Sequence, residues 1–261
     1  MEIAGYIASV FVGLVLGLLG GGGSILSIPI LVYLFGITPV LASAYSLFIV
    51  GVTSMVGALP KYKQQLMSVP TGLLFGIPSI VGIFVTRKWI VPSIPEVLWQ
   101  ADGFLLTKRI LLLGVFAVLM VLASFSMITG KEKEAESEHR FKVVLLALEG
   151  LLIGFLTGLV GAGGGFLIIP ALVFLTGLNF KVAAGTSLFI IAINSLSGFL
   201  GDVFNYTLDW SFLLKITLLA LVGIFVGNFF SSRIPGTRLR KAFGWLTLLM
   251  GCWILVKELM L

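Results

Sequence analysis

Two glycine clusters are the part of this chain that could do chemistry. Residues 20–24 read Gly-Gly-Gly-Gly-Ser and residues 161–165 read Gly-Ala-Gly-Gly-Gly, and each cluster interrupts an apolar run just before a short apolar segment. If those runs lie in a membrane, non-helical backbone between them must be buried in protein or line a wet cavity. The start of the following helix would add free N–H groups and the positive end of a helix dipole, an arrangement that binds anions. The clusters therefore predict a site for a small anion.

Hydroxyl and amide side chains on the next segments could complete this site without a buried charge. Ser46 and Ser187 hold equivalent positions in the two halves of the chain, and so do Ser54 and Ser195. The predicted substrate-binding residues are Gly21, Gly22, Gly23, Ser24, Tyr45, Ser46, Gly163, Gly164, Gly165, Thr186, Ser187 and Asn194. Two plainer interpretations stay open. Glycines let membrane helices approach closely, and a serine or threonine can bond a carbonyl of its own helix.

Glu149 is the one carboxylate that lies inside an apolar run. An acid within a membrane is costly and is a functional hypothesis by default. Its protonation could couple the movement of an anion to a proton gradient. Alternatively it lies near a helix end and is wetted by the interface, because seven residues of helix from Lys142 span only about 10 Å. The equivalent residue of the first half is Ala8, so this role would belong to one half only.

Other kinds of chemistry lack the residues they need. Cys252 is the only cysteine, which excludes a disulfide or a thiolate metal site within the chain. His139, the only histidine, lies in a charged stretch, and no nucleophile, base and orienting group occur together. Asp202, Asn205 and Asp209 bracket a loop and are predicted to cap and end helices. The sequence therefore predicts no enzyme, no metal site and no cofactor.

The composition indicates where the helices lie. Hydrophobic residues make up 59% of the 261 residues and charged residues only 11%, and the mean hydropathy is +1.16. A soluble domain would have about a quarter of its residues charged. The net charge of +6 falls in loops beside the apolar runs, which favours a role in membrane topology over nucleic-acid binding. We expect an all-α, polytopic integral membrane protein.

The chain is an internal duplication. Residues 17–57 match residues 158–198 at a constant offset of 141, with 19 identities in 41 pairs, among them Gly20/Gly161, Pro29/Pro170 and Ser46/Ser187. Units of this kind are recognised by rare residues kept in register. The predicted organisation is a first repeat over 1–129, a charged cytoplasmic linker over 130–141 and a second repeat over 142–261.

Each repeat is predicted to contain four or five membrane segments. The apolar runs are 3–19, 24–36, 40–59, 70–90 and 105–128, then 142–160, 166–177, 182–200, 210–230 and 239–258. The second run of each half has about 13 residues, which reach only about 20 Å, so a half-helix or re-entrant leg is expected there. Counting it as a span makes the repeats inverted and assigns eleven basic residues to the cytoplasmic side and five, including Arg87, to the other. Parallel repeats would give nine against seven, so the positive-inside rule favours inversion.

Residues 149–173, EGLLIGFLTGLVGAGGGFLIIPALV, resemble the TauE/SafE family of sulfite and sulfonate exporters, as do residues 184–189 and 17–29. The likeness extends over nearly the full chain. It implies secondary transport of small, mostly sulfur-containing anions such as sulfite, thiosulfate, sulfoacetate or related organosulfur acids across a prokaryotic inner membrane. It also implies that the pathway passes the glycine clusters, Pro29, Pro170, Ser46, Thr186 and Ser187.

We therefore expect a transporter in which paired half-helix N-termini hold an oxyanion near the midplane of the bilayer. Its predicted partners are a small anionic substrate, lipid and, as a candidate coupling ion, the proton, with no nucleic acid. A passive anion channel and a scaffold or sensor subunit that moves nothing remain alternatives. The sequence does not indicate the oligomeric state or the direction of transport.

Overall fold

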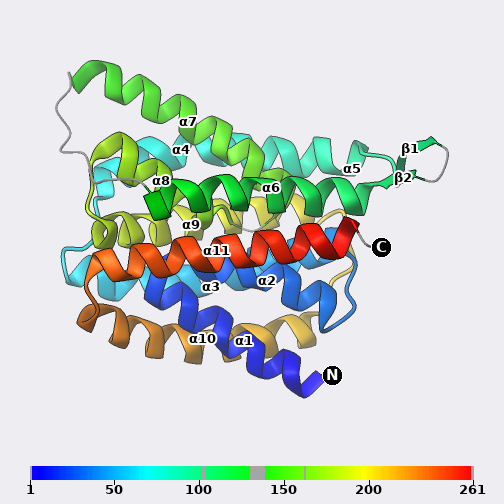
Figure 1. The fold of residues 1–261 in the computed structure, drawn as a ribbon, viewed down its shortest axis with the longest axis horizontal. Coiled ribbons are helices and arrows are strands. Elements are labelled where there is room, and N and C mark those ends of the chain that lie inside the picture. The colour runs from blue at the N-terminus through cyan, green and yellow to red at the C-terminus, as the bar shows by residue number, and fades with distance from the viewer. Residues whose placement is uncertain (1, 102–103, 130–138, 162, 260–261) are drawn as a thin grey trace.

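A computed structural model describes residues 2–101, 104–129, 139–161 and 163–259, and in this part of the chain the architecture is almost entirely helical (Figure 1). The first half contains α1 (Glu2–Leu19), α2 (Gly22–Tyr33), α3 (Pro39–Lys63), α4 (Val69–Val85), a π-helical turn η1 (Thr86–Ile90), α5 (Val91–Ser93) and α6 (Lys108–Thr129). The second half contains α7 (His139–Val160), α8 (Gly165–Thr176), α9 (Phe180–Asp202), α10 (Trp210–Arg233) and α11 (Gly236–Leu259). The prediction of an all-α protein is confirmed.

Every apolar run named above contains a helix close to the predicted position. In the run 70–90, α4 ends at Val85 and η1 follows, and the first three residues of the run 105–128 form a strand instead of helix. The short second run of each half is a helix of 12 residues, α2 or α8, and the break before it falls at the glycine cluster. One feature was not predicted: the antiparallel hairpin of β1 (Val97–Ala101) and β2 (Phe104–Thr107) between α5 and α6. Residues 130–138 of the predicted linker lie outside the described residues, and α7 already begins at His139.

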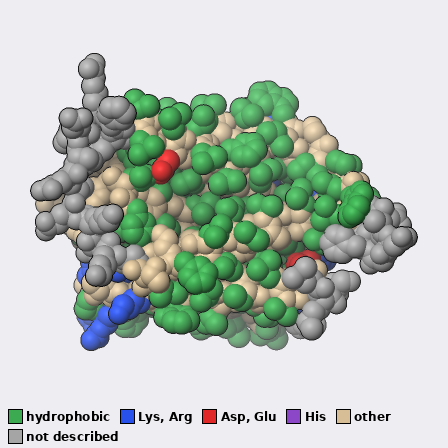
Figure 2. Space-filling model, turned by 45° about the horizontal axis from the view of Figure 1, so that its top comes forward, with side chains coloured by type: hydrophobic (Ala, Val, Ile, Leu, Met, Phe, Trp, Pro, Cys, Tyr) green, Lys and Arg blue, Asp and Glu red, His purple; other side chains and the backbone are tan. Residues whose placement is uncertain are grey.

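The described helices are those of an integral membrane protein. Seven of them are long and apolar enough to cross a bilayer, whereas α1, α2 and α8 are shorter apolar helices. Large hydrophobic side chains such as Leu122, Leu218 and Leu249 are exposed along the helices. Figure 2 shows a broad hydrophobic surface, with Lys and Arg side chains gathered at one end of the face shown. A surface of this kind, on helices of this length, fits the hydrocarbon of a bilayer.

Two long helices form the centre of the protein. The apolar stretches of α3 and α9 are 67% and 72% buried, whereas those of the other candidate spans are at most 44% buried. The two helices pack against each other, and they hold most of the predicted hydroxyl and amide residues. The candidate site residues that follow the glycine clusters therefore project from the most enclosed part of the structure.

Outer helices pack in pairs through glycine, with backbones in direct contact. Helix α1 packs along α10, where a Cβ added to Gly13 would lie 1.8 Å from the carbonyl oxygen of Ala220. The pair related to it by the duplication is α7 along α4, where a Cβ added to Gly154 would lie 2.2 Å from the carbonyl oxygen of Ser79. Each of these pairs joins one half of the chain to the other. Close approach at small residues is the usual way in which membrane helices associate. In Figure 1, α1 runs away from the end of the bundle that carries both chain termini, whereas its equivalent α7 runs toward that end, so the two equivalent helices run in opposite directions.

Candidate functional site

The two glycine breaks meet each other. A Cβ added to Gly21 would lie 2.7 Å from the carbonyl oxygen of Gly165, and one added to Gly165 would lie 2.6 Å from the α-carbon of Gly21. Helix α2 starts at Gly22 and α8 starts at Gly165, so the N-termini of both short helices lie at this junction. The first N–H groups of a helix have no partner within the helix. Two sets of such groups are therefore brought together, as the sequence predicts for an anion site.

Backbone conformation explains why the clusters need glycine. Gly20 and Gly161, which are equivalent, have φ angles of 75° and 77°, and Gly163 and Gly164 also lie in the left-handed region at 65° and 75°. Residues with a side chain rarely adopt this region. Gly23 serves helix packing instead, because a Cβ there would lie 2.2 Å from the carbonyl oxygen of Val12. Glycine is thus required by backbone conformation at some of these positions and by close helix packing at others.

Three of the predicted serines lie at or near the breaks. The hydroxyl of Ser187 lies within hydrogen-bond distance of two carbonyl oxygens, that of Gly20 at 2.9 Å and that of Ala184 in its own helix at 2.8 Å. The hydroxyl of Ser24 donates to the carbonyl oxygen of Gly21 at 2.7 Å. Ser46 forms a hydrogen bond of 2.5 Å with Ser27 of α2. These contacts connect the first break to α9 and helix α2 to α3, so the serines brace the non-helical backbone.

Other donors of the central helices are buried and unused. Among the described residues, the hydroxyl oxygens of Ser54 and Ser195 and the Nδ2 atom of Asn194 have no hydrogen-bond partner, although all three residues are fully buried. The carbonyl oxygen of Asn194 accepts from Ser79 at 2.8 Å. A Cβ added to Gly163 would lie 2.5 Å from the hydroxyl of Ser195, so this hydroxyl adjoins the second break. An unsatisfied buried donor costs about 1–3 kcal/mol, and such groups in a native protein call for an explanation.

Tyr45 and Thr186 point to the ends of the central helices instead of the glycine junction. The hydroxyl of Tyr45 accepts a hydrogen bond from the backbone N–H of Asp209, and the hydroxyl of Thr186 accepts one from the backbone N–H of Ser68. These residues hold the loops that precede α10 and α4. Asp209 itself caps α10 by accepting from the N–H of Phe212 at 3.0 Å, as the sequence predicts.

Glu149 is not brought to the junction. It lies half-buried on α7, and twelve residues of helix, about 18 Å, separate it from Gly161. Its neighbour Gly150 packs against the backbone of Phe75 in α4. A proton on Glu149 would therefore be remote from an anion at the glycine breaks.

A large cavity lies at the end of the molecule where α3 begins and α9 ends, and it is called the vestibule here. Its volume is about 690 Å³, and it is lined by Val32, Gly36, Ile37, Thr38, Pro39, Val40, Leu41, Glu96, Lys108, Arg109, Tyr206 and Thr207. No glycine of either cluster belongs to this lining. The glycine breaks are packed together and buried, so they do not form the open hollow that the sequence leads one to expect. A conformational change is needed to admit a ligand to them.

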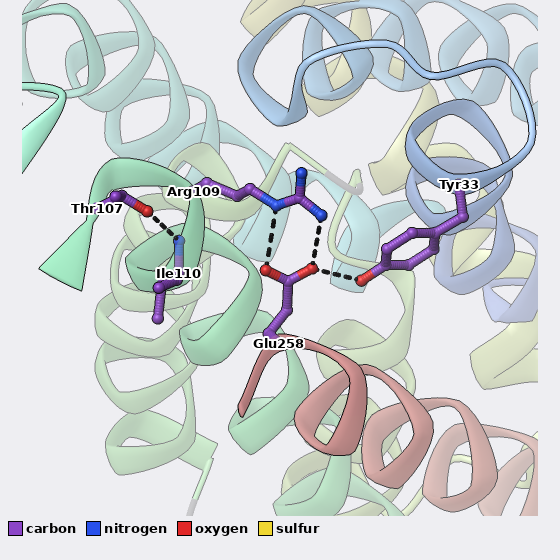
Figure 3. A network of polar contacts seen from close by, with 5 residues as sticks. All are labelled: Tyr33, Thr107, Arg109, Ile110 and Glu258. Carbon is purple, nitrogen blue, oxygen red and sulfur yellow. Dashed lines mark hydrogen bonds and ion pairs between the residues drawn. The ribbon is translucent and has the colours of Figure 1, made fainter. Parts of the chain in front are cut away.

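The wall of the vestibule is braced by a network around Glu258 (Figure 3). Arg109 of α6 donates to both carboxylate oxygens of Glu258 at 3.1 Å, and the hydroxyl of Tyr33 donates to Oε1 at 2.8 Å. A two-pronged contact of this kind is the strongest form of arginine–carboxylate pair. It fixes the ends of α2, α6 and α11 to one another.

Sequence reasoning missed a buried charged pair below the vestibule. Arg87, counted above as a loop cation, is fully buried in η1, and its Nη1 atom lies 3.1 Å from Oδ2 of Asp202 at the end of α9. The capping role predicted for Asp202 leaves out this contact. The duplication could have indicated that these positions are special, because both carry polar residues in each repeat. Arg87 is equivalent to Asn228 and Asp202 to Lys61, and all four side chains are buried.

The whole chain can be compared with known proteins. Residues 6–254 match the profile of the family described as "Sulfite exporter TauE/SafE". The chain belongs to the TauE/SafE family. A "Probable membrane transporter protein" of Xylella fastidiosa (strain Temecula1 / ATCC 700964) is 27% identical to it over 94% of this chain and 91% of the relative. The "Probable membrane transporter protein YunE" of Bacillus subtilis (strain 168) is 26% identical over 96% of this chain and 97% of the relative. No solved structure matches the chain.

Membership of the TauE/SafE family indicates the general role of this helical arrangement. The family and the names of the relatives indicate a membrane transporter and not an enzyme. In a transporter, helices broken near the middle of the membrane are the usual place for a substrate. Two broken helices meet at Gly21 and Gly165, and the unpartnered hydroxyl of Ser195 adjoins the second break.

Proposed function

We propose that this TauE/SafE protein is a secondary transporter of small sulfur-containing anions, such as sulfite, thiosulfate, sulfoacetate or related organosulfur acids, across a prokaryotic inner membrane. One observation carries the proposal: two helix N-termini meet at Gly21 and Gly165, close to buried donors that lack partners. Backbone N–H groups and neutral donors suit an oxyanion, which must lose its water on entering the site. Movement of the halves against each other would open the junction to each side in turn.

The proposed orientation places the linker and eleven basic residues on the cytoplasmic side. Lys63, Arg233 and Lys241 are exposed near the described helix ends that lie on the linker side of the bundle. The vestibule then opens on the opposite side. This arrangement follows the positive-inside rule and corresponds to inverted repeats.

The test is anion flux in vesicles that contain the purified protein. Ser187→Ala removes the hydroxyl that holds the Gly20 carbonyl, and flux of thiosulfate and sulfite should fall several-fold while the protein remains folded. Ser124→Ala is the matched control, because Ser124 is equally buried but bonds only the carbonyl of Val121 in its own helix. Equal flux in both variants would remove the support for this site.

The same vesicles separate the proposal from its alternatives. A passive channel would conduct the anion at a rate that a pH gradient does not alter, whereas a proton-coupled transporter would accumulate it against its own gradient. A scaffold or sensor subunit would show no flux at all. Because Glu149 lies far from the junction, Glu149→Gln should leave proton-driven accumulation of the anion unchanged. Loss of that accumulation in Glu149→Gln would assign the coupling role to Glu149.

A further inference from the structure

Arg87 and Asp202 form a charged pair sealed inside the protein. Both side chains are 0% exposed, and they join η1 to the end of α9. Replacing a buried ion pair by apolar side chains is often neutral or stabilising, so stability alone does not explain why the charges are there. The details of the contact point to another role.

The guanidinium group of Arg87 is only partly used. Its Nη1 atom contacts Oδ2 of Asp202 and donates to the hydroxyl of Ser43 at 2.8 Å. Its Nε and Nη2 atoms have no hydrogen-bond partner among the described residues, and neither carboxylate oxygen of Asp202 accepts a well-formed hydrogen bond there. Arginine presents a rigid fork of donors that fits two oxygens of one group. Here two of the three guanidinium nitrogens have no acceptor among the described residues, and we call them the open fork. They could donate to an oxyanion that is not part of the protein.

The position of Arg87 connects the vestibule to the glycine junction. On one side, Ser43 links the guanidinium to the carbonyl oxygen of Val40, which lines the vestibule. On the other side, a Cβ added to Gly161 would lie 1.8 Å from Nη2, so this nitrogen rests against the second break. An anion that enters from the vestibule toward the break must therefore pass the open fork.

We infer that Arg87 binds the transported anion at the vestibule end of the pathway, and that Asp202 is a tethered carboxylate that the anion must displace. The inference rests on the proposed function and names the residue that holds the charge of the substrate. A carboxylate that loses its arginine in a buried place is better accommodated as the neutral acid. One proton is then taken up by Asp202 for each anion that binds to Arg87, which links the two events.

Few other charged groups can take part. Of the described elements packed against η1, α4 and α5 carry no ionisable side chain, Glu149 of α7 and Lys181 of α9 lie several turns away along their helices, and Lys88 of η1 is exposed. The remaining neighbours are Tyr206 in the loop after α9 and, beside it in the vestibule wall, Glu96, which is largely exposed and lies 3.9 Å from Lys108. Burial and the nearby Asp202 carboxylate raise the pKa of the Tyr206 hydroxyl, so it stays protonated near neutral pH. Asp202 is thus the group that can change charge.

The opposite end of the central helices lacks such a competitor. Lys61 stands at the position equivalent to Asp202, and Asn228 at the position equivalent to Arg87. Lys61 is buried and donates to the hydroxyl of Ser231 at 2.8 Å, and no carboxylate contacts it in the described part of the chain. The proton-linked step is therefore expected at the vestibule end only.

The experiment measures thiosulfate binding to the full-length protein in detergent, because thiosulfate keeps one charge state between pH 6 and 8. In the native protein, binding should tighten by up to about tenfold for each unit that the pH falls, and a dye in weak buffer should show proton uptake on binding. Asp202→Asn should bind at least as tightly at pH 8 as the native protein does at pH 6, with no pH dependence and no proton uptake. Arg87→Gln should lose binding.

Three controls make the result decisive. Glu149→Gln should keep the native pH dependence, and so should Lys88→Gln, which removes an exposed cation next to Arg87. If either single change at the pair prevents folding, the neutral double variant Arg87→Gln/Asp202→Asn is used, and it should fold without binding thiosulfate. Native-like binding by that variant, or unchanged pH dependence in Asp202→Asn, would overturn the inference. Loss of thiosulfate binding and flux in the native protein itself would instead count against the proposed function.

Discussion

The hydroxyl of Tyr45 accepts a hydrogen bond of 2.8 Å from the backbone N–H of Asp209. Its equivalent in the other half, Thr186, accepts one of 2.9 Å from the backbone N–H of Ser68. Residues 68 and 209 differ by 141, so the same bond is formed twice by different side chains. Each central helix thereby holds the residue that precedes an outer helix, α10 in one case and α4 in the other.

Removing either hydroxyl should cost stability without abolishing transport. Tyr45→Phe and Thr186→Val each leave one backbone N–H without its partner, and we expect a loss of about 1–2 kcal/mol in the free energy of unfolding. A lower midpoint of thermal unfolding in detergent would show this. Because the two bonds are equivalent, a large effect in one variant and none in the other would contradict the interpretation.

The contact between the glycine breaks should tolerate no side chain. Gly21→Ala and Gly165→Ala place a methyl group against the backbone of the opposite break, and both should sharply reduce flux, folded yield or both. Gly114→Ala is the control, since a Cβ there meets nothing within 4 Å. It should lie within about 0.5 kcal/mol of the native protein in stability. Normal flux and yield in Gly21→Ala would mean that the two breaks are not held together as described.

A change at Ser195 should separate function from stability. Its hydroxyl has no partner among the described residues, so Ser195→Ala should leave the unfolding midpoint unchanged or slightly raised. If the hydroxyl serves the anion, the half-saturating concentration for flux should rise several-fold. Ser9→Ala is the comparison, because Ser9 is buried and bonds the carbonyl of Gly5 in its own helix. A fall in stability with unchanged flux would identify Ser195 as structural.

Much of the fold could be predicted because the signals are local. Apolar runs and glycine interruptions set the helix ends, and the offset of 141 set the equivalences that recur in the contacts of Tyr45 and Thr186. The meeting of Gly21 with Gly165 depends on how the halves pack, which no local pattern contains. The hairpin of β1 and β2 was missed because β1 lies between the two apolar runs and Leu105 of β2 was counted in the run 105–128.

Arg87 was missed for a different reason. A basic residue after an apolar run is normally read as the end of a span, and its neighbour Lys88 is exposed as that reading requires. The π-helical turn at Thr86–Ile90 lies where Arg87 faces inward. Such single-turn bulges often occur at functional sites, but sequence periodicity does not reveal them.

The contact between Gly21 and Gly165 makes the packing of each repeat depend on the other. The two contact residues are not equivalent in the duplication, because Gly21 corresponds to Ala162 and Gly165 corresponds to Ser24. At the junction, any residue larger than glycine in one copy would push directly on the main chain of the other. Each of these glycines is therefore restricted by the opposite repeat, and a separated half would lack the surface that closes its own break.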